Sequence, residues 1–121
     1  DGETSNKEGN SKAPADPKNI FSMTRKAIGF IEAQVAAKKP FFVQVSHYAE
    51  HNAVQYLEET YEACLRDKNI ANITPVALRK RVAQRSAMVE DMDHGIGTLI
   101  EKLDQLGVVK DYAVHPRLDY R

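Results

Sequence analysis

Apolar residues recur at helical spacing in three parts of the chain. In the first part they stand three or four residues apart, which predicts an amphipathic helix with one buried face. Ser22 or Thr24 is the expected cap, and the pattern continues to about Ala37. The apolar positions of this helix are Ala27, Ile28, Phe30, Ile31 and Val35.

Two further helices are predicted downstream. The second ends near Asp67 and carries Val54, Leu57, Tyr61 and Cys64 on one face. The third starts at Thr74-Pro75, with Thr74 as cap, and Gly107 ends it. Its apolar stripe is Val82, Val89, Met92, Ile96, Leu99, Leu103 and Leu106. Gly95 and Gly97 lie inside this helix, which indicates either close packing against another element or a kink.

Between the first two helices the pattern changes to that of a strand. Lys38, Lys39 and Pro40 interrupt the helix, and the mostly apolar run 41–46 follows, which is typical of a buried strand. Residues 108–114 could begin a second strand, although Pro116 and the charges around it oppose a long one. The fold class expected is therefore α/β, with two or three helices and one or two strands.

Composition narrows the function classes. A chain of 121 residues is the size of one domain. Its 17 Lys+Arg balance 17 Asp+Glu, so no global field favours nucleic acid or an anionic membrane. No apolar run approaches the roughly 20 residues that span a bilayer. Cys64 is the one cysteine, which excludes an internal disulfide and a thiolate zinc cluster within the chain. Residues 1–16 have almost nothing to bury and are expected to form a disordered tail or exposed loop.

Two stretches carry a family resemblance. The run from Lys39 to His51, KPFFVQVSHYAEH, resembles the sulfatase segment in which a Lys-Pro-Phe-Phe strand delivers a histidine to the active site. The run from Met88 to Gly97, MVEDMDHGIG, looks like the helix that follows in that family, and 27–32 is similar to the helix before the strand. The resemblance covers about Asn19 to Val109.

This resemblance implies a fold and an activity. Sulfatases belong to the alkaline phosphatase superfamily, whose fold is a large α/β sandwich, so residues 17–109 are expected to be an internal fragment of such a catalytic domain. Residues 110–121 depart from the family pattern and are taken as a divergent or truncated end. The parent enzyme would hydrolyse sulfate esters, either aryl sulfates or sulfated carbohydrates, and by family habit would be periplasmic, secreted or lysosomal.

The family's cofactors are implied for the parent rather than for this chain. Sulfatases use Ca²⁺ and a formylglycine made from the motif Cys/Ser-x-Pro/Ala-x-Arg. Cys64 is followed by Leu65, Arg66 and Asp67 and does not match that motif. The calcium-binding Asp pair and the later Asp-Asn-Gly turn do not occur in the chain either. We therefore expect no metal ligand from these residues and no turnover from the fragment alone.

The resemblance singles out His51 as the candidate catalytic and substrate-binding residue. By family resemblance it would contact the sulfate group, and as an imidazolium it could steady or protonate the leaving oxygen. The competing interpretation is an ordinary loop histidine. His47, four residues earlier, is the second candidate for substrate binding, in a supporting role; a metal pair is disfavoured because no third ligand follows at a suitable spacing.

Other charged groups are assigned to the surface. His94 is expected at a solvated or packed helix position, and the acidic residues Glu90, Asp91 and Asp93 at a solvated face, since neighbouring helical positions diverge. The basic stretch 79–85 lacks interleaved aromatic residues, so solubility explains it better than ligand binding.

Two alternatives differ in class. A non-enzymatic helical module could bind a partner through an apolar face, because a lone strand would leave Phe41 and Phe42 without a sheet; self-association that depends on concentration would favour it. The other alternative keeps the superfamily and makes the parent a phosphatase or phosphonate hydrolase.

Overall fold

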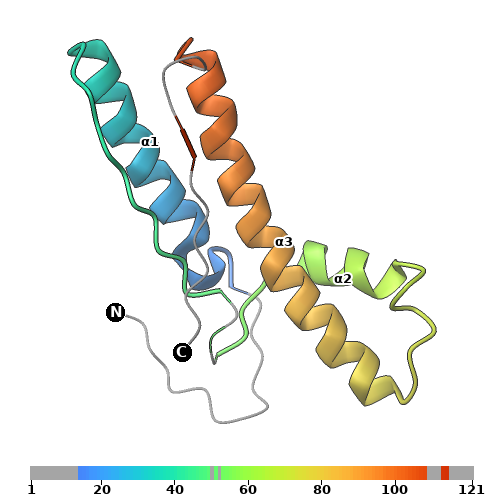
Figure 1. Cartoon of the computed structure of the whole chain (residues 1–121). Helices are drawn as coiled ribbons and strands as arrows, with labels where there is room; N and C mark the ends of the chain where they lie inside the picture. Colours follow the sequence, from blue (N-terminus) through green and yellow to red (C-terminus); the bar gives the residue numbers. More distant parts are fainter. Residues whose placement is uncertain (1–13, 50, 52, 109–112, 115–121) are drawn as a thin grey trace.

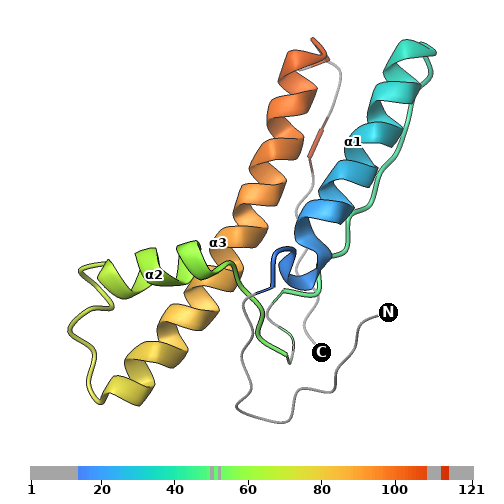
Figure 2. The same ribbon diagram turned by 180° about the vertical axis from the view of Figure 1, so that it is seen from behind.

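One long helix organises the structure. The computed structural model describes residues 14–49, 51, 53–108 and 113–114. After a short 3-10 turn, η1 (Pro17–Asn19), come α1 (Ile20–Ala36), α2 (Glu58–Arg66) and α3 (Val76–Gln105). Both views show α1 alongside the C-terminal half of α3, whereas α2 crosses α3 near the N-terminal half of α3 (Figures 1 and 2). The three predicted helices are confirmed.

The start of α1 corrects the predicted cap. Neither Ser22 nor Thr24 caps the helix; their hydroxyls donate back to Asn19 O (3.2 Å) and Ile20 O (2.8 Å). The carboxylate of Asp16 accepts instead, from the amides of Phe21 (2.8 Å) and Ser22 (3.2 Å). These amides belong to the first turn of α1 and have no acceptor within the helix, so the preceding carboxylate supplies one. Its negative charge also interacts favourably with the positive end of the helix dipole.

The contact between α1 and α3 centres on Gly95. A Cβ atom there would lie 2.7 Å from Ile20 Cγ2 and 3.0 Å from Thr24 Oγ1. Ile20 is fully buried, so the helices approach this closely only because position 95 has no side chain. Close packing, one of the two explanations predicted for the glycines, is thus confirmed for Gly95, whereas Gly97 has no atom within 4 Å.

The contact between α2 and α3 forms a second small core. Its buried members are Tyr56, Cys64, Ala83 and Ala87. The predicted second helix starts later than expected, at Glu58, after an irregular stretch. Pro75, rather than Thr74, is the residue before the first turn of α3, and no side chain caps that end. Gly107 follows the helix with φ of 73°, a conformation that glycine adopts without strain.

The predicted strand at 41–46 is not formed as a strand. Residues 39–49, here named the extended segment, run back along α1 without helical turns (Figures 1 and 2). Within the described residues no second strand pairs with it, and a strand needs such a pairing. Nor is it buried on both sides, since Phe42 is 83% exposed. The segment keeps one property of a strand, the alternation of side-chain exposure: odd positions from 41 to 47 are half-buried and the even positions between them are exposed.

The second predicted strand and the two chain ends fall largely outside the described residues. Of 108–114, only Val108, Ala113 and Val114 are described, and they are not part of a strand. The described part of the chain is therefore helical, and the sheet expected for an α/β domain is not seen in it.

Candidate functional site

His51 lies exposed in the turn that follows the extended segment. Its amide donates to Tyr48 O over 3.3 Å, which closes the turn, and Ala49 within the turn is buried. Ala53, two residues on, has φ of 69°, which turns the chain away toward α2. The backbone therefore presents the His51 side chain to solvent at one end of the segment, as a residue that binds an external ligand requires.

His47 lies on the half-buried side of the extended segment. It follows the period of its half-buried, odd-numbered neighbours, and its Nδ1 atom is buried without a hydrogen-bond partner among the described residues. Burial lowers the pKa of His47 below the ordinary value of 6.5, because desolvation penalises the imidazolium. The ring is thus neutral near pH 7. Within the described part of the chain, no hydrogen bond joins the two predicted site residues.

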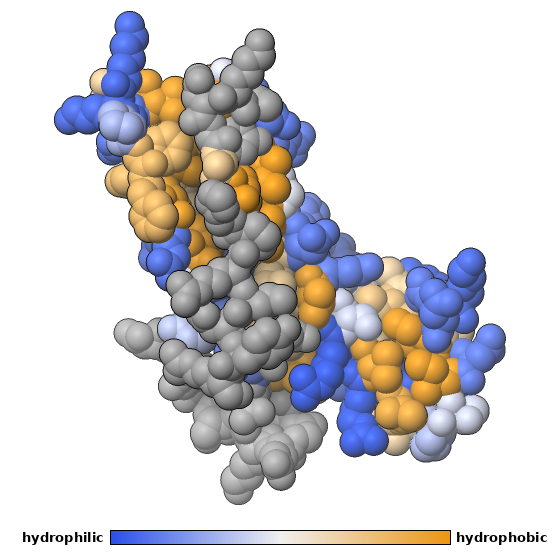
Figure 3. All heavy atoms as spheres, viewed as in Figure 1, coloured by the Kyte–Doolittle hydropathy of each residue, from blue (hydrophilic) through white to orange (hydrophobic). Residues whose placement is uncertain are grey.

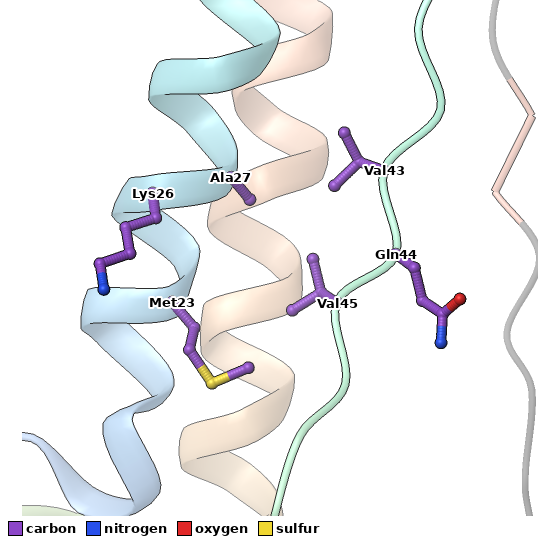
Figure 4. Close-up of a pocket in the computed structure, with 6 residues that line it drawn as sticks. All are labelled: Met23, Lys26, Ala27, Val43, Gln44 and Val45. Carbon is purple, nitrogen blue, oxygen red and sulfur yellow. The ribbon is translucent and has the colours of Figure 1, made fainter. Parts of the chain in front are cut away.

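A shallow groove separates α1 from the extended segment. Val43 and Val45 point toward the helix and Gln44 points away from it (Figure 4). On the helix side the groove is lined by Met23, Lys26 and Ala27, and its volume is about 270 Å³. Its walls are mostly apolar side chains, which suits packing of the segment on the helix rather than recognition of a charged ester.

Asp91 is a buried carboxylate that the sequence interpretation placed wrongly. It was expected on a solvated acidic face, and that holds for the exposed Glu90 and Asp93. Asp91, however, is 1% exposed. It accepts hydrogen bonds from the amide of Leu57 (2.7 Å) and the hydroxyl of Thr60 (2.6 Å). These donors lie at the start of α2, so Asp91 anchors the beginning of that helix to α3.

The spacing of α3 contains the signal that identifies Asp91 as buried. Its buried positions recur every four residues at Ala83, Ala87, Asp91 and Gly95. A carboxylate at the same four-residue spacing as buried alanine and glycine residues lies on the packed face of the helix. A buried carboxylate is stable only when hydrogen-bond donors surround it.

Cys64 has the environment of a structural thiol. It is 5% exposed, and its Sγ atom donates to Glu90 Oε2 at 3.6 Å. Burial, the charge of Glu90 and this hydrogen bond raise the pKa of Cys64 from 9.0 to about 11. A protonated thiol facing a carboxylate is a poor nucleophile. The concavity beside it, about 500 Å³, is lined by Ala63, Cys64, Asp67, Asn69, Ile70, Ser86 and Glu90.

The described residues fit neither of the cofactors that sulfatases carry. Among them, no group of three or more His, Cys, Asp or Glu side chains converges as a metal would need. Cys64, the one cysteine, is buried and lies outside the formylglycine motif.

His94 and the basic stretch 79–85 make contacts that stabilise the structure. His94 is exposed on α3, and its ring meets that of Phe21 edge-on, with centroids 6.2 Å apart. In the basic stretch, Arg79 donates from Nε to the carbonyl of Ile73 over 3.1 Å, which ties the start of α3 to the preceding loop. Within the described ranges, no helix combines the length and the apolar character that crossing a membrane would require.

Comparison with known proteins gives one match. The family described as Sulfatase matches residues 6–115, which is most of the chain and includes His47, His51 and the whole of α1 to α3. No curated protein and no solved structure matches the chain significantly.

Proposed function

The chain belongs to the sulfatase family, and from that membership we propose that it forms part of a catalytic domain that hydrolyses sulfate esters, with His51 in contact with the sulfate group. The observation that carries the proposal is the placement of His51. His51 is exposed in a turn that its own amide closes by donating to Tyr48 O, next to the buried Ala49.

His51 would act through hydrogen bonding and charge. A sulfate ester carries a negative charge while a nucleophile attacks sulfur, and negative charge develops on the leaving oxygen as the S–O bond breaks. An imidazolium can donate to a sulfate oxygen and can pass a proton to the leaving oxygen. An exposed side chain in this turn can approach the ester without rearrangement of the core.

His47 has a supporting part in this proposal. Its ring is half-buried and neutral, and it stands where the extended segment passes into the His51 turn. A neutral imidazole can donate from one nitrogen and accept at the other, so it can orient a neighbouring group or a bound substrate without adding charge. We assign it to substrate binding, in support of His51.

The parent enzyme would supply the rest of the chemistry. We assign the formylglycine nucleophile and the Ca²⁺ ligands of the family to segments other than the described residues, since these fit neither group. The extended segment would be one strand of the alkaline-phosphatase-like sandwich. The substrate would be an aryl sulfate or a sulfated carbohydrate, and the site would lie outside the cytoplasm, as in the periplasm, the secreted fraction or a lysosome.

The test compares histidine variants in the full coding sequence that contains residues 1–121. Turnover of 4-nitrophenyl sulfate and of 4-nitrophenyl phosphate is measured for the natural protein, His51→Ala and His94→Ala. Sulfatase turnover that falls about 100-fold or more in His51→Ala, and stays unchanged in His94→Ala, supports the proposal. Preference for the phosphate ester would point to a phosphatase, and equal activity in both variants would remove His51 from the site.

The chain of residues 1–121 on its own is expected to show no turnover of either ester. It lacks the nucleophile motif, and its one thiol is buried. A sulfatase signal that survives repeated purification and disappears in His51→Ala would contradict this expectation.

A further inference from the structure

Tyr48 begins the turn that His51 closes. The amide of His51 donates to the carbonyl oxygen of Tyr48 over 3.3 Å. A turn closed by a bond between its first and fourth residues holds the Cα atoms of those residues within about 7 Å of each other. A ligand bound by the side chain of one of them therefore lies close to the other.

Tyr48 is also exposed, as His51 is. Of the other residues that the structure describes in the turn and beside it, His47 and Ala53 are half-buried and Ala49 is buried. Tyr48, by contrast, is 64% exposed. The described part of the turn thus presents two side chains to solvent, one imidazole and one phenol.

Tyr48 lies beyond the part of the extended segment that a sheet of the parent enzyme would cover. Phe42, 83% exposed, belongs to the run 41–46, which would be a strand of that sheet. Apolar atoms also reach the surface over the end of the molecule where α1 and the extended segment lie (Figure 3). Neighbouring strands and helices would bury such groups. Tyr48 comes two positions after the run, and in open α/β sheets ligands bind outside the carboxyl ends of the strands.

A sulfate ester has two parts that an enzyme has to recognise. In the proposed function His51 contacts the charged sulfate. The other part of an aryl sulfate or a sulfated sugar is a ring with an apolar face, and an aromatic side chain packs against such a face with its own flat surface. Tyrosine adds a hydroxyl group, which can donate to or accept from a substituent of the ring.

We propose that Tyr48 is a specificity-determining residue of the sulfatase site, whose ring packs against the ring of the leaving group while His51 contacts the sulfate. The role rests on the proposed function, since the ring of the ester reaches Tyr48 only when its sulfate is held at His51. The substrate class is then an ester whose leaving group contains a ring. An open-chain sulfate such as ethyl sulfate has no ring face and gains nothing from Tyr48.

The test measures steady-state kinetics of the full coding sequence that contains residues 1–121, as the natural protein, Tyr48→Ala and Tyr48→Phe. The substrates are 4-nitrophenyl sulfate and glucose 6-sulfate, and inorganic sulfate serves as a competitive inhibitor without a ring. Tyr48→Ala should raise KM and lower kcat/KM about tenfold for at least one of the two esters. The inhibition constant of sulfate should change less than about twofold, because the sulfate contact is made by His51. Tyr48→Phe keeps the ring and should recover at least about half of the natural kcat/KM.

The same measurements separate failure of this role from failure of the proposed function. If His51→Ala abolishes turnover while Tyr48→Ala keeps the natural kcat/KM for both esters, the function stands and Tyr48 has no part in recognition. If Tyr48→Ala weakens inhibition by sulfate as much as it weakens the esters, Tyr48 supports the turn or the fold, and the specificity role is wrong. A natural protein that turns over neither ester, or a His51→Ala variant with natural activity, removes the proposed function and the role of Tyr48 with it.

Discussion

Asp91 on α3 holds the first turn of α2 through Thr60, whose hydroxyl donates to Asp91 Oδ1 over 2.6 Å. The other carboxylate oxygen accepts from the Leu57 amide over 2.7 Å. A helix of nine residues has little stability by itself, so α2 depends on contacts such as this one for its position. The two hydrogen bonds tie α2 to the helix that follows it in sequence, α3, which also packs against α1.

Asp91→Asn should lower the free energy of unfolding by about 1.5 to 3 kcal/mol, because the amide can no longer accept at both atoms and one buried donor loses its partner. Urea unfolding followed by circular dichroism measures the change. Asp93→Asn, at an exposed position of the same helix, is the control and should stay within about 0.5 kcal/mol of the natural chain. Equal midpoints for the two variants would show that the carboxylate does not stabilise α2.

Gly95→Ala should destabilise the chain, since its methyl group would meet Cγ2 of the fully buried Ile20 at 2.7 Å. Overpacking of this kind costs about 1 to 3 kcal/mol. Gly97→Ala is the matched control: no atom lies within 4 Å, so the better helix propensity of alanine should stabilise α3 by about 0.5 to 1 kcal/mol. Thermal unfolding of both variants would show opposite shifts. Parallel shifts would contradict the close approach of α1 and α3.

Cys64 should resist alkylation in the native chain. With the pKa of the thiol raised from 9.0 to about 11, the thiolate fraction at pH 8 falls about 100-fold, and labelling by iodoacetamide should slow at least in proportion. Denaturing urea should restore the ordinary rate. Glu90→Gln should speed labelling of the folded chain, because the nearby carboxylate contributes to the raised pKa, whereas Asp93→Asn should leave the rate unchanged. Fast labelling of the folded natural chain would rule out this environment.

His47 should make the chain sensitive to acid. Its pKa is lowered in the folded state from 6.5, so below pH 6.5 the unfolded chain binds more protons, and stability falls as the pH drops toward the folded-state pKa. The free energy of unfolding, measured between pH 7.5 and pH 5, should fall less steeply in His47→Asn than in the natural chain. His51→Asn should retain the His47-dependent fall. Identical pH profiles for His47→Asn and the natural chain would mean that the ring is solvated.

Hydrophobic periodicity was enough to locate the three helices, because the residues on the buried face of an amphipathic helix recur three or four positions apart in the sequence. It did not locate their caps. Asp16 lies several residues before the amides that it binds, and Asp91 reaches its donors from another helix. Local capping rules consider the residue next to the helix, so they selected Ser22, Thr24 and Thr74, which make no capping bond.

The predicted strand shows a different limit of sequence reasoning. The run 41–46 has the composition of a strand, and the structure keeps its two-residue alternation of exposure. Whether such a run becomes a strand depends on a partner, and partners are not encoded in the run itself. The proposed site has the same dependence: the proposal uses His51 from this turn and assigns the groups that act with it to other segments.

The long helix α3 also has a consequence for the order of folding. Its contact with α2 joins neighbours in sequence, whereas the contact at Gly95 brings α1 back across the extended segment and α2. Closing the longer loop costs more chain entropy, so the α2–α3 hairpin should assemble before α1 docks. Refolding kinetics can resolve the two steps: Asp91→Asn should slow folding, while Gly95→Ala should mainly speed unfolding.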